Sequence, residues 1–172
     1  NQKEVADWLR EQRVAVVFIM VSNVIREETI RAVRIGLINK HAALLPSCRG
    51  LYPYVWAIVH DHPLGVTFHD VQAEIDKGRI LCQRGVDDRY KSRSLVSFYE
   101  HVFALFPEMS VEAIGALRVG DCVVPPQDLQ DSYYSLPMKT DYQQFRRRGG
   151  RLVRVQDYMT LLRSLISGGR IR

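Results

Sequence analysis

The interpretation of the fold starts from residues 94–109, which read SLVSFYEHVFALFPEM. The apolar side chains in this stretch recur every three or four residues, at Leu95, Phe98, Val102, Leu105 and Phe106. This spacing places side chains on one face of an α-helix. Pro107 limits the helix, because a proline inside a helix removes a backbone hydrogen bond. The stretch therefore predicts an amphipathic helix with a buried face.

The rest of the chain supports a helical interpretation. Helical spacing or capping residues predict further helices over residues 4–26, 27–45, 51–59, 67–75, 110–120 and 153–166. Residues 14–21 would also suit a buried strand, and residues 83–93 are polar enough to form a loop. The prediction is an all-α fold, a bundle of roughly four to six helices with an extra N-terminal helix and long irregular loops. We expect its core to include Val71, Ile75, Leu162 and Ile166.

Composition indicates one globular domain, or one domain with a tail. The chain has 172 residues, of which 47% are hydrophobic and 25% charged, values that exclude a disordered chain. The three cysteines are widely spaced and form no CxxC pair, so we expect a reducing compartment. The longest apolar run is shorter than the ~20 residues that cross a bilayer. We expect an intracellular protein, nuclear rather than cytoplasmic, without a membrane partner. Because it opens at Asn1, we also expect a piece of a longer chain.

Positive charge is concentrated at the C-terminal end. From Lys139 onward, nine Lys or Arg residues stand against two Asp residues, a balance of +7 in a chain with net charge +5, so the preceding part sums to −2. We divide the chain into a helical body, residues 1–137, and a basic segment with a C-terminal helix, residues 138–172, that packs on the body. Arginine runs suit contact with phosphates. The candidate nucleic-acid contacts are Arg146, Arg147, Arg148, Arg151 and Arg154, which a solvated linker or an acidic protein partner would explain equally.

No pattern of catalytic residues stands out in the sequence. His60, His62 and His69 could ligate a metal, but polar turn residues ahead of a helix explain them as well. The three cysteines stand in unrelated contexts, and the chain has no Gly-x-Ser-x-Gly motif. Its two Gly-Gly pairs lack the spacing of a phosphate-binding loop. We therefore expect no catalytic activity, no metal and no cofactor.

Three segments share the residue spacing of one known family. Residues 52–64 are rich in tyrosine and end in Pro-Leu, residues 71–80 (VQAEIDKGRI) fit Ile-x-x-Lys-Leu-x-x-Gly-x-Tyr, and residues 98–106 (FYEHVFALF) fit Phe-x-x-Asp-Val-x-Leu-Met-Phe. In this order they resemble the bromodomain family, a left-handed four-helix bundle that binds acetyl-lysine. Ala113 stands where that family has its pocket asparagine, and no asparagine follows Asn39. The resemblance therefore implies weak or no acetyl-lysine binding.

The resemblance also implies a function. It suggests a non-catalytic protein-interaction module of a chromatin or other nuclear complex, with a histone tail or another subunit as its partner. The ligand cleft would be lined by Tyr52, Tyr54, Trp56, Val59 and Ala113. Two alternatives stay open: a nucleic-acid-binding component of a ribonucleoprotein that uses the arginine cluster, and a scaffold subunit without a site of its own.

Overall fold

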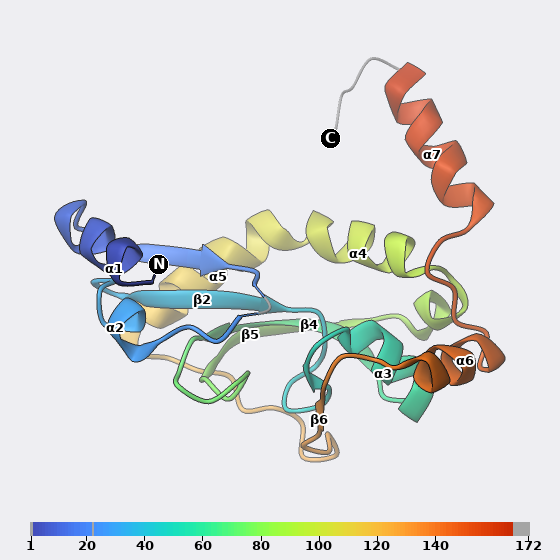
Figure 1. The fold of residues 1–172 in the computed structure, drawn as a ribbon, viewed down its shortest axis with the longest axis horizontal. Helices are drawn as coiled ribbons and strands as arrows, with labels where there is room; N and C mark the ends of the chain where they lie inside the picture. Colours follow the sequence, from blue (N-terminus) through green and yellow to red (C-terminus); the bar gives the residue numbers. More distant parts are fainter. Residues whose placement is uncertain (1, 22, 167–172) are drawn as a thin grey trace.

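The computed structural model describes residues 2–21 and 23–166, and in them the chain adopts an α/β fold, not the predicted all-α bundle. Four strands form one sheet in the order β1-β2-β4-β5 (Figure 1). In chain order the elements are α1 (Gln2–Glu11), β1 (Val16–Ile19), α2 (Glu27–Ile30), β2 (Gly36–His41), β3 (Arg49–Gly50), α3 (Pro53–His60), β4 (Leu64–Asp70), β5 (Ile80–Val86), the 3-10 helix η1 (Asp88–Ser92), α4 (Leu95–Ala104), α5 (Phe106–Val119), β6 (Tyr133–Tyr134), α6 (Lys139–Arg147) and α7 (Val155–Ile166).

Two of the predicted helices end early and are followed by strands. The helix predicted over residues 4–26 stops at Glu11, and β1 follows it. The helix predicted over residues 27–45 shrinks to the four residues of α2, and β2 follows. β1 and β2 pair in parallel, with Val16 opposite Gly36. The β-branched residues that gave the helical spacing suit a pleated sheet, where the neighbouring strand satisfies their backbone hydrogen bonds.

The central strand β4 corrects two further predictions. Every residue of β4 is buried, and the strand pairs antiparallel with β2 on one side and with β5 on the other. The prediction of a helix over residues 67–75 is therefore wrong. The loop predicted over residues 83–93 instead contains the end of β5 and the 3-10 helix η1. Because β4 (LGVTFHD) is buried on both faces, its apolar and polar residues show no period-two alternation, and the sequence pattern does not identify it as a strand.

A helix follows Pro53 as predicted, but the helix predicted over residues 94–109 is interrupted: α4 ends at Ala104, and Pro107 lies in the first turn of α5 instead of limiting the first helix. The hydroxyl of Ser94 caps α4 by accepting a backbone hydrogen bond of 3.1 Å from its first turn. Phe98 in α4 is fully buried and stacks on Tyr54 in α3, with ring centroids 4.8 Å apart. The helix predicted over residues 110–120 is the second part of α5. These helices share one hydrophobic core with β4 and β5, while α1 packs with β1 and β2 in a second, smaller core.

A second sheet of two strands joins distant parts of the chain. β3 pairs in parallel with β6. Beside this pair, the Arg49 guanidinium lies 2.7 Å from the Asp131 carboxylate, and the Cys48 amide donates to the Ser132 hydroxyl at 2.9 Å. Residues 131–134 therefore fix the segment that follows β2.

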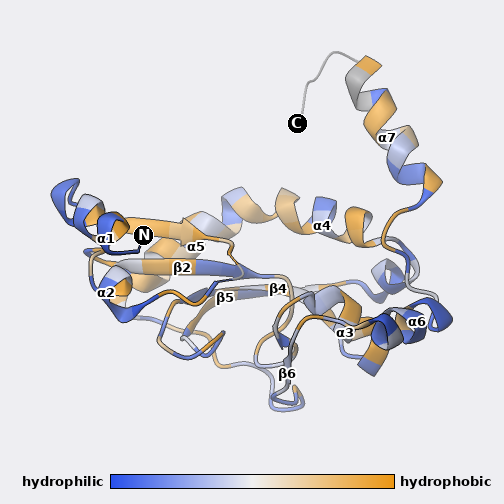
Figure 2. Ribbon diagram, viewed as in Figure 1, coloured by the Kyte–Doolittle hydropathy of each residue, from blue (hydrophilic) through white to orange (hydrophobic). Residues whose placement is uncertain are grey.

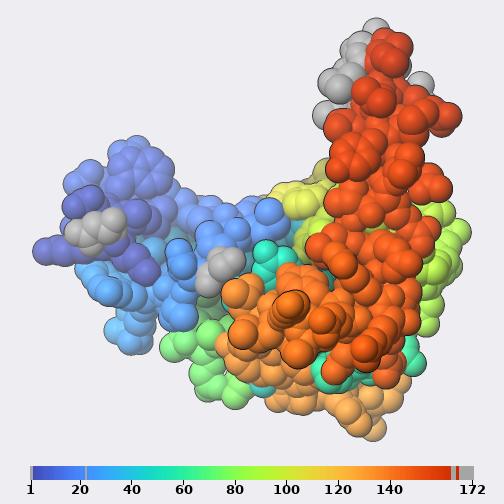
Figure 3. All heavy atoms as spheres, turned by 45° about the vertical axis from the view of Figure 1, so that its right-hand side comes forward, coloured from blue at the N-terminus to red at the C-terminus, as the bar shows by residue number. Residues whose placement is uncertain are grey.

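The last helix, α7, rises away from the body of the molecule (Figures 1 and 3). Its apolar residues, visible in Figure 2, were expected in the core, but Leu162 is 50% and Ile166 85% exposed. The apolar face of a helix indicates which side can pack, but it does not show that another element covers that side. Ile75, another expected core residue, is also exposed, whereas Val71 packs against the smaller core. The boundary after residue 137 stays a prediction. Within the described residues, no helix has the length and apolar character needed to span a membrane.

Candidate active site at the end of the central strands

Strand pairing places polar side chains together on one face of the sheet. Asn39 in β2 lies directly opposite His69 in β4 in the antiparallel register. Opposed side chains of a strand pair share a face, and Asn39 Nδ2 lies 3.1 Å from His69 Nε2. His41 points to the same face as Asn39 because side chains alternate along a strand.

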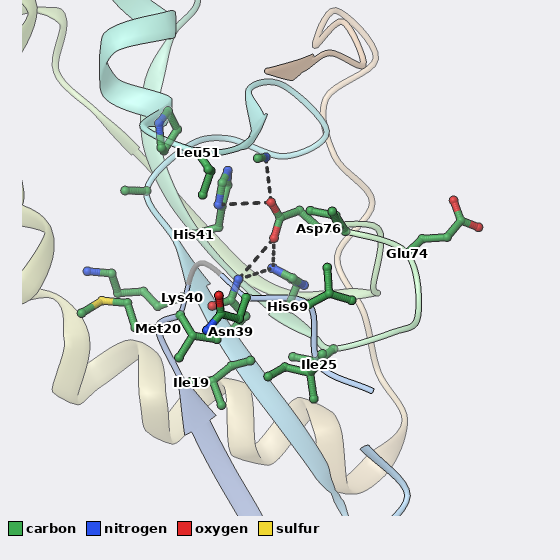
Figure 4. A pocket seen from close by; sticks show the side chains of 18 of the residues that line it. Ile19, Met20, Ile25, Asn39, Lys40, His41, Leu51, His69, Glu74 and Asp76 are labelled. Carbon is green, nitrogen blue, oxygen red and sulfur yellow. Dashed lines mark hydrogen bonds and ion pairs between the residues drawn. The ribbon is translucent and has the colours of Figure 1, made fainter. Parts of the chain in front are cut away.

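Asp76 connects these side chains from a loop between β4 and β5 (Figure 4). Its Oδ1 atom accepts a hydrogen bond from Asn39 Nδ2 at 3.3 Å and lies 3.4 Å from His69 Nε2. Its Oδ2 atom accepts a hydrogen bond from the Gly50 amide at 2.8 Å and lies 3.7 Å from His41 Nδ1. One carboxylate thus joins β2, β4 and the small sheet. We refer to Asn39, His41, His69 and Asp76 as the polar cluster.

The loop over residues 71–79 is shaped to present Asp76. Asp70, at the end of β4, accepts a hydrogen bond of 2.8 Å from Arg79 Nε, which ties the two ends of the loop together. Gly78 passes so close to β4 that an added Cβ would lie 1.7 Å from the Asp70 carbonyl oxygen. Asp76 itself has a φ of 50°. Such left-handed backbone in a non-glycine residue persists where the surroundings hold it, and it is frequent at functional sites.

Hydrogen bonding fixes the tautomer of His41. Its Nε2 atom lies 2.8 Å from the Cys48 carbonyl oxygen, which can only accept, so Nε2 carries the proton. Burial lowers the pKa of His41, and the attraction of Asp76 opposes this shift only in part. The neutral ring presents the lone pair of Nδ1 toward Asp76, at a distance too long for a direct hydrogen bond. His41 is therefore available as a proton acceptor.

Asp76 is ionised. Burial alone would raise its pKa, but the contacts with the imidazoles of His69 and His41, together with the hydrogen bond from the Gly50 amide, outweigh burial and hold the pKa at about 2. An ionised carboxylate stabilises positive charge on a neighbouring imidazole. His69 donates its Nδ1 proton to the Asp70 carbonyl at 2.8 Å, which leaves Nε2 of the neutral ring to accept a hydrogen bond from the side-chain amide of Asn39.

The polar cluster lines a cavity of about 270 Å³. One wall is apolar and comes from the segment between β1 and α2 and from the loop after β4; its residues are Val21, Val24, Ile25, Val71 and Ile75. Lys40 and Met20 lie on the other side of the polar cluster, as Figure 4 shows. An apolar cavity with a few convergent polar groups is typical of a small-molecule site. A neutral imidazole, a carboxylate and an amide can together accept a proton and donate hydrogen bonds to a reacting group.

The histidines considered as metal ligands lie in two different places. His69 belongs to the polar cluster, whereas His60 and His62 lie beside Tyr134, with ring centroids 4.8 and 6.2 Å from the Tyr134 ring. Within the described residues, no group of three His, Cys, Asp or Glu side chains is arranged to hold a metal ion.

The residues expected to line a cleft are also dispersed. Tyr52 is 46% exposed and lines the cavity, whereas Tyr54, Trp56, Val59 and Ala113 are buried in the main core. The five arginines expected to contact phosphates lie at the end of α6 and in the segment up to α7: Arg146, Arg147, Arg148, Arg151 and Arg154. All but the last are exposed.

The sequence interpretation missed Asn39, His41 and Asp76. Their pattern is visible in the sequence as Asn-x-His in an apolar stretch, followed by His69 and, seven positions later, Asp76. Alternate positions converge only on a strand, so the pattern carries no meaning while the stretch is taken as a helix. The strand assignment was the missing step.

Comparison with known proteins gives the site its context. Residues 1–103 match the family model described as formyl transferase. The methionyl-tRNA formyltransferase of Enterococcus faecalis is 30% identical over 110 residues, which are 63% of this chain and 35% of that protein. The corresponding protein of a Thermotoga species is 27% identical over 144 residues, 82% of this chain and 45% of that protein. The chain thus spans less than half the length of these curated relatives.

Solved structures give the same fold. The formyltransferase PseJ from Anoxybacillus kamchatkensis, in complex with UDP-4,6-dideoxy-4-formamido-L-AltNAc and tetrahydrofolate, superposes with a TM-score of 0.60 and 27% identity, over 76% of this chain and 68% of that one. Glycinamide ribonucleotide transformylase 1 from Symbiobacterium toebii gives a TM-score of 0.61 at 24% identity, over 73% and 60% of the chains. The second match supports the fold alone.

These matches correct the functional expectations from the sequence. The bromodomain resemblance is wrong, because the matched family is an enzyme family with a sheet at its centre. The expectation of a non-catalytic chromatin module, the histone-tail partner and the ribonucleoprotein alternative with its nucleic-acid contact are wrong for the same reason. The three segments that suggested a bromodomain belong to α3, to the loop after β4, and to α4 and α5, so their shared spacing came from unrelated elements. A nuclear location stays a prediction.

Proposed function

Since the chain belongs to the formyl transferase family, we propose that it transfers a formyl group from a tetrahydrofolate carrier to a primary amine. The observation that carries this proposal is the polar cluster at the cavity, in which an amide, a neutral imidazole and an ionised carboxylate converge. The amine nitrogen attacks the formyl carbon, the bond from that carbon to the carrier nitrogen breaks, and one proton moves from the amine to the carrier nitrogen. The cluster offers a group for each of these needs.

Asn39 suits the formyl oxygen. Negative charge develops on this oxygen when the amine attacks, and a positioned N–H donor stabilises it. Asn39 Nδ2 donates to Asp76 Oδ1 at 3.3 Å and lies 3.1 Å from His69 Nε2, so both of its protons are engaged, and the formyl oxygen would take over one of them when substrate binds. Preorganised donors of this kind typically contribute 10²–10³ in rate.

His41 suits the transfer of the proton. Its Nδ1 lone pair faces the cavity side occupied by Asp76, and the proton on Nε2 is held by the Cys48 carbonyl. A proton accepted at Nδ1 creates an imidazolium next to the ionised carboxylate, which stabilises it as the carboxylate of a Ser-His-Asp triad does. The same proton can then pass to the departing nitrogen of the carrier.

The apolar wall suits the carrier. The flat ring of a reduced folate would lie against the apolar side chains of this wall, which come from the segment between β1 and α2 and from the loop over residues 71–79 and line the cavity next to Asp76. The cavity volume of about 270 Å³ accommodates a ring system and leaves the rest of the carrier in solvent. A relative that is 27% identical contains tetrahydrofolate in its solved structure, which supports this choice.

The test has two steps on the purified chain. Tetrahydrofolate binding is measured by isothermal titration calorimetry, and release of tetrahydrofolate from 10-formyltetrahydrofolate is then followed with a panel of primary amines. Asn39→Ala should lower the rate at least about 100-fold with little change in tetrahydrofolate affinity. His60→Asn, which removes an imidazole outside the polar cluster, serves as the control for His41→Asn. Equal rates for the two histidine variants would contradict the proposed role of the cluster.

A further inference from the structure

Lys40 lies between two residues of the polar cluster, yet its ammonium group has no hydrogen-bond partner. The residue is 4% exposed, and Nζ is buried without a partner. Because side chains alternate along β2, Lys40 points away from its two neighbours and toward α4. There Nζ lies 3.5 Å from the ring centroid of Phe103 and 5.5 Å from that of Tyr99.

The N–H groups of the Lys40 ammonium therefore have no hydrogen-bond acceptor in the protein. An ammonium group carries three N–H donors, and buried donors in folded proteins are nearly always satisfied. The faces of two aromatic rings attract a cation but accept no conventional hydrogen bond. Burial lowers the pKa of Lys40 to about 8, so most molecules still carry the charge at neutral pH. A buried, charged and unpaired donor set is the feature that an anionic ligand would complete.

The position of Lys40 indicates which reactant would supply that anion. Lys40 lines the same cavity as the polar cluster, together with Met20, Tyr52 and Tyr99. In Figure 4, Lys40 and Met20 lie on one side of Asn39, and Asp76 with the loop that carries it lies on the other. The two reactants of a transfer must meet at the cluster from different sides. If the carrier occupies the wall formed by the loop, the amine substrate occupies the side of Lys40.

We propose that Lys40 is a specificity-determining residue that binds an oxyanion, a phosphate or a carboxylate, of the amine substrate. The inference rests on the proposed function, because it needs the carrier on the opposite side of the cluster. The ammonium donates to the oxyanion, and the exposed ring of Tyr52 covers the group that bears it. The site thus selects an amine that also carries an oxyanion.

The test uses the whole chain with inorganic phosphate and acetate as separate probes. Their dissociation constants are measured by NMR titration at constant ionic strength for the wild type, Lys40→Met, Lys40→Arg and Lys139→Met, which removes an exposed lysine on α6. We expect Lys40→Met to weaken the preferred probe at least about tenfold, and Lys40→Arg and Lys139→Met to retain most of the affinity. The stronger probe identifies the oxyanion.

Tetrahydrofolate is titrated into the same four proteins to separate this inference from the proposed function. Unchanged affinity in Lys40→Met supports the assignment of Lys40 to the amine substrate. A loss confined to this variant would overturn it, because the oxyanion would then be the glutamate carboxylate of the carrier. Failure of the wild type to bind tetrahydrofolate contradicts the proposed function and with it the inference. Normal tetrahydrofolate binding with no Lys40-dependent binding of either probe overturns the inference alone.

Discussion

Replacing Lys40 by Met should raise the free energy of unfolding, although the position is buried. Burial lowers the pKa of Lys40 from 10.5 to about 8. Each pKa unit corresponds to about 1.4 kcal/mol, so desolvation of this charge costs the folded chain about 3 kcal/mol, of which the attraction of the two rings offsets ~1–2 kcal/mol. Methionine keeps the unbranched stem and removes the charge, and it leaves an apolar group against the rings of Phe103 and Tyr99.

The gain should depend on pH in a defined direction. Below pH ~8 the ammonium is protonated in the folded and the unfolded chain, and the full penalty applies. Between pH ~8 and ~10.5 the unfolded chain binds more protons than the folded one, so the stability of the wild type rises with pH. Burial also raises the pKa of Tyr99, the titratable ring that faces the ammonium, so its phenol stays neutral in most of this range. The advantage of Lys40→Met should therefore be about 1–2 kcal/mol at pH 7 and decrease as the pH approaches 10.5.

Urea denaturation followed by tryptophan fluorescence measures this difference. The wild type, Lys40→Met and Lys139→Met are compared at pH 7 and at pH 9.5, and the exposed Lys139 should show no change at either pH. A Lys40→Met variant that is less stable than the wild type at pH 7, or an advantage that does not decrease with pH, would refute the reasoning.

Four further predictions concern the site and its frame. Asp76→Asn should lower the free energy of unfolding by about 2 kcal/mol at pH 6, because the pKa of about 2 in the folded chain lies below the ordinary 3.8. This contribution of Asp76 is present above pH ~4 and is lost as the pH falls through ~2. Equal free energies of unfolding for the wild type and the variant at pH 6 would contradict it. Gly78→Ala should abolish formyl transfer, because its Cβ would meet the Asp70 carbonyl oxygen at 1.7 Å, whereas kinetics of Gly85→Ala, which has open space around it, should stay normal. The rate of formyl transfer should stay constant as the pH is lowered to 6.5 and should decrease only at lower pH, because the pKa of His41 is lowered. A rate that already decreases above pH 7 would disprove this. Phe98→Ala should lower the free energy of unfolding by about 3–5 kcal/mol because Phe98 is fully buried, and a urea melt with a change below about 1 kcal/mol would exclude that packing.

The helices after Pro53 and Ser94 could be predicted because each begins with a residue that has a local structural role. Proline suits the first turn of a helix, and a serine hydroxyl satisfies a free amide there. β2 offers no such local evidence. Its pairing partners, β1 and β4, come from other parts of the chain, and its two apolar residues, Leu37 and Ile38, fit a helix equally well. Tertiary pairing therefore decided the structure where local propensity was neutral.

The site was missed for a related reason. Asn39 and His41 lie on the same side only if β2 is a strand, and Asp76 reaches them only because the loop after β4 turns back over the sheet. Of the residues expected to bind a ligand from the sequence, Tyr52 lines the cavity. Aromatic residues are common both in cores and in clefts, and composition alone could not separate Tyr52 from the buried Tyr54.

The two-stranded sheet has a consequence for how this site can be moved or exchanged. The family match ends at residue 103, and the whole polar cluster lies before that point. The Gly50 amide that orients Asp76, however, sits on a strand whose only neighbour in its sheet, within the described residues, is β6, at residues 133–134. A gene fragment cut at residue 103 would encode every group of the cluster and omit the support of one of them. Recombination between relatives, or a graft into another scaffold, must therefore carry residues 131–134 together with the cluster to keep the carboxylate in place.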